Sequence, residues 1–162
     1  NIIGMGFISD IADYAVRNGK KFGALTYMVA LFSVLGRFRP YKVKLIYGKD
    51  RNVIENNKTY FLTISNTKYT GGAIKIAPDA MFDDGLMDVV YLHDLNRFEF
   101  LYGFLQTFRG GHLKMKKICS TVKTEYLEIE ATPQFLTLPD GDLVGNTPLR
   151  VTLLPKEIEL IV

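Results

Sequence analysis

Two acidic turns hold the residues whose types and spacing are best suited to chemistry. One is "LPDGDLVG" at 138–145, where Asp140 and Asp142 flank a glycine. The other is "MFDDGL" at 81–86, where two adjacent aspartates precede a glycine. A carboxylate on such a turn can accept a proton from a substrate or bind a hard cation, but it can equally hydrogen-bond local backbone amides. Taken alone, Asp-Gly between extended apolar runs predicts only a β-hairpin, because both turn positions need φ > 0.

Most other active-site motifs are absent from the sequence. It contains no phosphate-binding GxxxxGK[ST] loop and no nucleophile elbow, and the lone G-x-G at 4–6 predicts a tight strand-to-loop turn. His93 and His112 lie far apart and Cys119 is the single cysteine, so a zinc site is not expected. A lone cysteine also excludes a disulfide within the chain and favours a reducing compartment, and on its predicted strand it is expected to be a small buried hydrophobe.

Length and composition predict one folded domain with a real core. The chain has 162 residues, of which 48% are hydrophobic and 23% are charged, and its formal net charge is +3. This mild charge allows contact with phosphates or an anionic membrane surface without requiring either, and nucleic acid is not an expected partner. The apolar stretch at 24–36 is shorter than the roughly 20 residues that span a bilayer, which predicts a buried helix.

Three helices and many short strands are predicted, which gives an α+β fold class built on a β-rich sandwich of mostly antiparallel strands. The first helix, 9–18, has Ser9 or Asp10 as its cap, and the second covers 24–35. The third, 96–109, opens with a capping box formed by Asn96 and Glu99. Strands are predicted from period-2 alternation or β-branched content at 41–48, 59–66, 73–77, 86–92, 117–123, 125–131, 134–138, 149–154 and 157–162.

The third predicted helix is rich in aromatic residues. Helical spacing places an apolar stripe on one face of this helix, and only Phe100 and Phe104 lie outside it. The stripe is expected to pack into the core. The alternative is that the aromatic residues of the helix contact lipid acyl chains. The stripe consists of Phe98, Leu101, Tyr102, Leu105 and Phe108. The basic residues that follow are expected to be solvated, with anionic lipid as the alternative partner. They are Arg109, Lys114, Lys116 and Lys117.

Three stretches together resemble the catalytic family of diacylglycerol kinases, soluble lipid kinases that include bacterial diacylglycerol kinases and sphingosine kinases. The opening "NIIGMGF" is similar to the family's Asn-x-x-Gly-x-Gly-Phe. The stretch at 65–92 contains an Asn followed by a Gly-Gly run, and then Ala-Pro-x-Ala and Asp-Gly-x-x-Asp patterns. "DGD" at 140–142 lies where the family has Asp-Gly-Glu. The matching positions are Asn1, Gly4, Gly6, Phe7, Asn66, Gly71, Gly72, Ala77, Pro78, Ala80, Asp84, Gly85, Asp88, Asp140, Gly141 and Asp142.

The resemblance implies a two-domain enzyme of which residues 1–162 are the C-terminal β-sandwich domain. The N-terminal nucleotide-binding domain, with its Gly-Gly-Asp-Gly-Thr motif, has no counterpart in these residues, which agrees with the abrupt start at Asn1. ATP is the implied phosphate donor, bound mainly by that other domain. Mg²⁺ is implied at a structural site formed by the Asp84 carboxylate and the carbonyls of Met81 and Leu86. The implied location is the cytoplasm, with peripheral contact with the membrane surface. The implied substrate is a lipid, and a homodimer is possible.

The resemblance also implies that the carboxylate at position 142 is the general base. Here it belongs to Asp142 rather than Glu, and the shorter side chain withdraws it by about one bond length, a displacement that can cost ~10²-fold in rate. Two alternatives therefore stay open. One is a non-catalytic lipid-binding or regulatory sandwich, and the other is a kinase for a soluble acceptor, as in the related NAD kinases.

Overall fold

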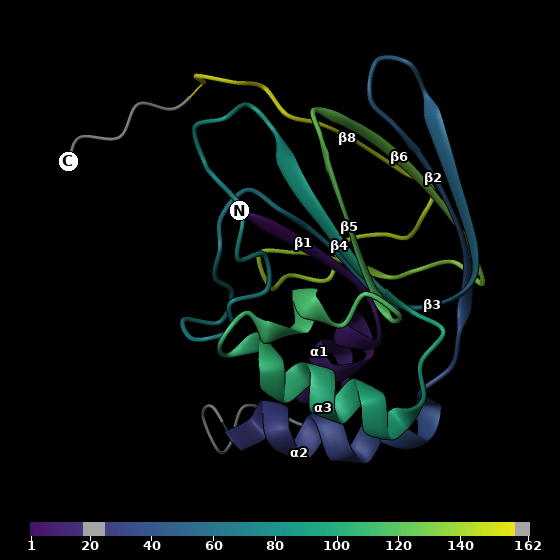
Figure 1. The fold of residues 1–162 in the computed structure, drawn as a ribbon. Helices are drawn as coiled ribbons and strands as arrows, with labels where there is room; N and C mark the ends of the chain where they lie inside the picture. Colours follow the sequence, from purple (N-terminus) through teal and green to yellow (C-terminus); the bar gives the residue numbers. More distant parts are fainter. Residues whose placement is uncertain (18–24, 158–162) are drawn as a thin grey trace.

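A β-sheet of eight strands forms the centre of the chain in the computed structural model, which describes residues 1–17 and 25–157 (Figure 1). Neighbouring strands pair antiparallel throughout. The strands are β1 (Ile2–Gly6), β2 (Tyr41–Tyr47), β3 (Asn52–Ser65), β4 (Met87–His93), β5 (Cys119–Thr124), β6 (Tyr126–Thr132), β7 (Thr137–Pro139) and β8 (Leu149–Thr152).

The long strand β3 joins the two halves of this sheet. Its first half pairs with β2, which continues through β6 to β8, whereas its second half pairs with β4 on one side and β1 on the other. The register shifts near Thr59, where β3 passes from one set of partners to the other. A bulge of this kind bends a strand and increases its twist. The sheet therefore folds over on itself, and the predicted α+β, sandwich-like class is confirmed.

One apolar core lies between the two halves. On β2, Tyr41, Val43 and Leu45 are buried while Lys42 is exposed, which is the period-2 pattern of a strand with one covered face. These side chains meet residues from both halves of the sheet. The other fully buried members are Met5, Leu62, Ile64, Met87, Val89, Tyr91, Leu127, Ile129 and Phe135.

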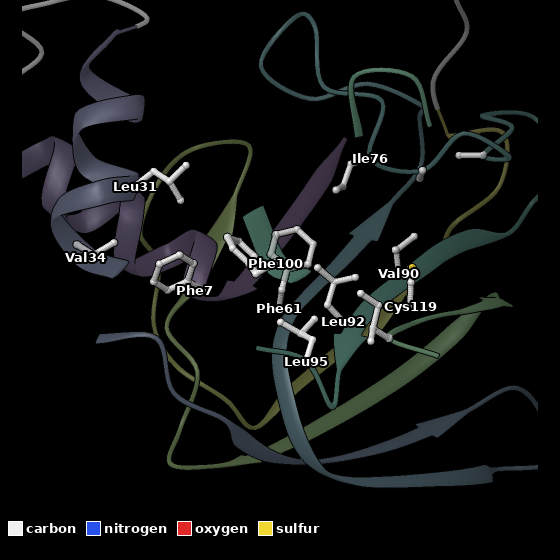
Figure 2. Packing of buried hydrophobic residues seen from close by; sticks show 13 residues of the cluster. Phe7, Leu31, Val34, Phe61, Ile76, Val90, Leu92, Leu95, Phe100 and Cys119 are labelled. Atoms are coloured by element: carbon white, nitrogen blue, oxygen red, sulfur yellow. The ribbon is translucent and has the colours of Figure 1, made fainter. Parts of the chain in front are cut away.

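A second core lies between the other face of β3 and β4 and the helices (Figure 2). Phe100 is at its centre, with its ring 5.1 Å from those of Phe7 and Phe38. Phe61 and Leu92 of the sheet and Leu31 and Val34 of α2 belong to the same cluster. The helices are α1 (Phe7–Arg17), α2 (Leu25–Val34) and α3 (Arg97–Thr107), with short 3₁₀ turns at Leu35–Arg37 and Gly111–Lys114.

The start of α1 differs from the prediction. The helix begins at Phe7, directly after β1, and Ser9 is a buried residue inside it whose hydroxyl donates to the Leu136 carbonyl at 2.7 Å. Neither Ser9 nor Asp10 is therefore the cap. Gly6 makes the abrupt change possible, because its φ is +79° and a Cβ there would lie 2.7 Å from the Tyr60 carbonyl oxygen.

The face of α3 that packs on the sheet is the opposite of the predicted one. Phe100 is 3% exposed and Phe104 packs against the same core, whereas Phe98 and Tyr102 point to solvent. Only Leu101 of the predicted stripe contacts the core. The capping box at Asn96 is confirmed, with its side chain accepting from two helix amides and Glu99 accepting from the Asn96 amide.

Most predicted strands are present, but "AIKIA" at 73–77 is not one. This segment forms a single bridge between Thr70 and Ile74, and Ile76 and Ala77 anchor a long loop on the helix-side core. Its alternation reflects one-sided burial without a neighbouring strand. The strand predicted at 157–162 lies almost wholly outside the described residues. No helix in 1–17 or 25–157 is long and apolar enough to cross a membrane.

Candidate functional site

The Asp140–Asp142 turn is a hairpin tip tied to the first strand. Asp140 and Gly141 have φ values of 45° and 98°, and the Asp142 amide donates to the Pro139 carbonyl at 2.9 Å. Thr137 pairs with Val144 on the return. Asp140 Oδ1 accepts from the Ile2 amide at 3.0 Å, while the Asp140 amide donates back to the Ile2 carbonyl. The two aspartates thus have different roles, because Asp140 fastens the turn and leaves Asp142 exposed at its tip.

Strand register brings distant residues onto the same end of the sheet. Ile2 is paired with Ser65, Ser65 with Asp88, and Asp88 with Lys123. Directly paired residues of antiparallel strands project from the same face. Asp140 continues the row through its bonds to Ile2. A row of polar side chains therefore crosses the sheet on its helix-side face, and we call Ser65, Asp88 and Lys123 the polar row.

Lys123 is the centre of charge in this row. Its ammonium donates to the Asp79 carbonyl at 2.8 Å and lies 3.4 Å from Asp84 Oδ2 and from Asp88 Oδ2. Asp88 is 5% exposed, and its Oδ2 makes no well-formed hydrogen bond with the described residues despite the proximity of the ammonium. Burial raises the pKa of Asp88, and the Lys123 charge lowers it in part. The row thus contains a buried carboxylate held next to one tethered cation.

The loop at 81–86 is an Asx turn with capacity for a cation. Asp84 Oδ1 accepts from the Leu86 amide at 2.9 Å, which is the local capping expected of an Asp-Gly turn. Its Oδ2 faces Lys123. A carboxylate and the main-chain carbonyls of a loop are oxygen donors of the kind that Mg²⁺ takes, so the residue types fit the ion, with the Lys123 ammonium as a competing cation. Within the described residues, no three His, Cys, Asp or Glu side chains form a metal cluster.

Two hydrogen-bonding atoms without partners among the described residues lie in the polar row and next to it. Ser65 Oγ and Asn66 Oδ1 are buried and have no partner in the described part of the chain. The Asn66 amide donates to the Asn1 carbonyl at 2.9 Å, and the Thr67 hydroxyl donates to the Asn1 side chain. Buried polar atoms without partners are few in native proteins, so two neighbouring ones mark a place where a polar ligand or water can bind.

The predicted site residues thus gather at one end of the fold without forming one bonded cluster. Asp142 and the loop at 81–86 flank the polar row from opposite sides, and no hydrogen bond or ion pair among the described residues joins Asp142 to Lys123. Ser65 and Lys123 were not predicted from the sequence. No local signal marks them, because only the pairing of β3, β4 and β5 places them beside Asp88.

A separate small cavity lies between the sheet and α3. It has a volume of about 50 Å³, and its walls include Phe61, Ile76, Phe104 and His112. His112 is 1% exposed, and its Nε2 bonds to the Ile76 carbonyl at 2.9 Å while its Nδ1 has no partner in the described residues. Burial lowers the pKa of His112, so the ring is neutral at pH 7. The cavity is large enough for a water molecule but too small to hold a lipid acyl chain.

Comparison with known proteins places the whole chain in one family. Residues 1–162 match the family described as "YegS C-terminal NAD kinase beta sandwich-like domain". A diacylglycerol kinase of Mycobacterium tuberculosis (strain CDC 1551 / Oshkosh) is 26% identical over 159 residues, which cover 96% of this chain and 49% of that protein. A probable YegS-like lipid kinase of Shewanella frigidimarina is 30% identical over 139 residues, covering 86% and 43%. The chain therefore spans about half the length of these relatives.

A solved structure shows the same fold. The crystal structure of a diacylglycerol kinase from Bacillus anthracis str. Sterne superposes with a TM-score of 0.61 at 18% identity. The match covers 96% of this chain and 46% of that one. At this level of identity the likeness speaks for the fold of residues 1–162 and for nothing finer.

Proposed function

Because this chain belongs to the YegS C-terminal NAD kinase beta sandwich-like family, the C-terminal domain of diacylglycerol kinase and YegS-type lipid kinases, we propose that it forms the acceptor side of an ATP-dependent lipid kinase. The observation that carries the proposal is the exposed Asp142 carboxylate on a hairpin tip that Asp140 ties to β1. The polar row supports it, as do the Ser65 and Asn66 oxygens at the same end of the sheet, which have no partner in the part of the chain that the structure describes.

In the proposed reaction, Asp142 accepts the proton of the lipid hydroxyl as that oxygen attacks the γ-phosphorus of ATP. The new P–O bond forms as the bond to the β-phosphate oxygen breaks, and ADP leaves with that electron pair. Phosphoryl transfer needs chiefly positioning and charge stabilisation from the protein, so a rigid mount for the base matters more than its strength. With Asp in place of Glu, the backbone of the turn must lie about one bond length closer to the acceptor.

Mg²⁺ is proposed at the 81–86 loop, held by the Asp84 carboxylate and the carbonyls of Met81 and Leu86. When bound it supplies positive charge that fixes the loop. Asp84 would then have to turn Oδ2 from Lys123 to the ion, while Lys123 keeps its hydrogen bond to the Asp79 carbonyl. ATP would be bound by an N-terminal domain, and the protein would work in the cytoplasm at the membrane surface.

The deciding experiment is ATP-dependent phosphorylation by the full-length protein that carries this chain. Wild type, Asp142→Asn and Asp142→Glu are assayed on diacylglycerol and other lipid alcohols, with NAD as a soluble acceptor. Asp50→Asn is the matched control, because Asp50 is also an exposed turn aspartate, at the β2–β3 hairpin. We expect Asp142→Asn to lower kcat by about 10²-fold or more, and Asp142→Glu to retain or raise activity.

Two outcomes would redirect the proposal. If lipid phosphorylation is unchanged in Asp142→Asn, then Asp142 is only a turn residue and the base lies elsewhere. If wild type phosphorylates no lipid, the Asp at position 142 favours a lipid-binding or regulatory domain that retains the fold. Activity on NAD alone would instead indicate a kinase for a soluble acceptor, the alternative that the family's likeness to NAD kinase keeps open.

A further inference from the structure

The outer face of α3 is apolar and uncovered in the described structure. Phe98, Tyr102, Leu105 and Phe108 are 83%, 56%, 62% and 47% exposed. Spacings of four, three and three residues place them along one side of the helix, opposite the buried Phe100. Single exposed apolar residues are ordinary, but four along one helix form a contiguous stripe that marks an interaction surface. We call these four residues the outer stripe.

Basic residues follow at the C-terminal end of the stripe. Arg109 and Lys114 line a surface hollow of about 410 Å³, together with the backbone of Gly110 and Gly111 and the ring of Tyr102. Lys116 and Lys117 are exposed next to it in sequence. No carboxylate in residues 1–17 or 25–157 lies within ion-pair distance of any of these four cations. The hollow is therefore a place where anionic groups can bind without displacing a protein partner.

Helix α2 lies beside α3 on the same side of the molecule (Figure 1). Val29 and Phe32 on α2 are 51% and 59% exposed, and the Arg97 side chain at the start of α3 reaches the Gly36 carbonyl just after α2. Arg97 and Arg37 are exposed where the two helices meet. Apolar side chains in the middle and cations at both ends thus characterise the helical side of the fold.

We propose that the outer stripe and the basic hollow dock the protein on an anionic phospholipid bilayer. Helix α3 lies along the bilayer surface, with the stripe in the interfacial layer and Arg109 and Lys114 at the lipid phosphates. Aromatic and aliphatic residues on one helix face, with unpaired cations beside them, match the pattern of helices that bind membrane surfaces. Charge favours this partner over a second copy of the chain. Among the described residues, the lining of the hollow contains no Asp or Glu, and Glu99 on α3 is used in the helix cap, so the same surface of a second copy has no free carboxylate to pair with these cations.

This docking surface is independent of the proposed catalysis. It uses no residue of the polar row or of the Asp142 hairpin, so a failure of the kinase proposal would leave it standing, and the reverse also holds. The test is co-sedimentation of the full-length protein with vesicles of phosphatidylcholine alone and of phosphatidylcholine with 30% phosphatidylglycerol. Two variants are compared with wild type, namely Phe98→Ser/Leu105→Ser and Arg109→Gln/Lys114→Gln. The matched control is Lys49→Gln/Val53→Ser, with similar exposure but located at the β2–β3 hairpin.

We expect wild type to bind the anionic vesicles and to be released by salt, because surface charge attraction is screened. The Arg109/Lys114 variant should bind anionic vesicles about 25-fold more weakly, at about fivefold per basic residue, and the Phe98/Leu105 variant at least tenfold more weakly. The control should bind as wild type does. Unfolding temperatures within about 2 °C of wild type would show that the variants fold.

Other results overturn the proposal. Equal binding of all variants, or equal affinity for neutral and anionic vesicles, would show that neither the stripe nor the hollow contacts lipid. A wild-type dimer that the Phe98/Leu105 variant converts to monomers would assign the stripe to a second copy of the chain. A large loss of stability in the Phe98/Leu105 variant would show that the outer stripe packs against another part of the same protein.

Discussion

Replacing Lys123 with methionine should destabilise the fold in a pH-dependent way. Methionine retains most of the aliphatic length of lysine but removes the ammonium that lies 3.4 Å from the Asp84 and Asp88 carboxylates. Asp88 is then a buried carboxylate with no neighbouring cation among the described residues. The pKa of Asp88, already raised by burial, should rise further.

The size of the effect follows from how exposed the pair is. At 3.4 Å and an effective dielectric constant of about 20, the attraction is about 5 kcal/mol before desolvation is counted. The Lys123 side chain is 37% exposed and Asp88 6%, so the pair lies between exposed pairs, worth about 0–1 kcal/mol, and buried pairs whose disruption costs about 3–5 kcal/mol. After discounting for solvent screening, we expect a loss of about 1–2 kcal/mol at pH 7. For a chain of 162 residues that is about 2–8 °C in Tm.

The pH dependence separates this cause from lost packing. The folded state binds the Asp88 proton more tightly than the unfolded state does, because the pKa of Asp88 is raised in the fold. Asp88 therefore contributes stability when the pH is below its unfolded-state pKa, and this contribution is lost as the pH rises through the folded-state pKa. Without Lys123 the loss on ionisation grows. The Lys123→Met effect should therefore be largest near pH 7 and should shrink as the pH falls and Asp88 takes up its proton.

Urea unfolding of wild type, Lys123→Met, Asp88→Asn and the double variant gives the coupling directly. We expect a coupling energy of about 0.5–2 kcal/mol at pH 7, with Asp84 accounting for part of the remaining Lys123 effect. Strictly additive losses, or a Lys123→Met effect that is the same at pH 3 and pH 7, would refute the electrostatic reasoning. Lys123 would then act only through the packing of its aliphatic chain and its bond to the Asp79 carbonyl.

Two further expectations concern magnesium and the single cysteine. Addition of Mg²⁺ should raise the Tm of Lys123→Met more than that of wild type, because the competing ammonium beside Asp84 Oδ2 is gone. Asp84→Asn should abolish this response. If the Tm of all three proteins is insensitive to Mg²⁺, the 81–86 loop binds no metal. Burial raises the pKa of the Cys119 thiol to about 11. An aromatic disulfide reagent at pH 8 should therefore modify the thiol about 10²-fold more slowly in the native protein than in urea. Comparable rates would show that the core around β5 opens readily.

Features set by a few neighbouring residues were predictable from the sequence. The capping box of Asn96 and Glu99, the positive-φ turn at Asp140 and Gly141, and the alternating burial of β2 all appear as expected. Each depends on contacts within three or four residues or on a strand's own period, and such contacts form wherever the segment lies in the fold.

Features set by long-range pairing were not predictable. The stripe on α3 contains the larger number of apolar residues, yet Phe100 from the other face is buried, because the sheet and α1 offer its ring a pocket formed with Phe7 and Phe38. Likewise, Ser65, Asp88 and Lys123 are far apart in the chain and meet only through the register of three strands. Local residue types therefore determined the turns, the cap and the candidate carboxylates. Burial and strand register, which depend on how distant surfaces fit together, decided which carboxylate gains a cation and which helix face is left for a partner.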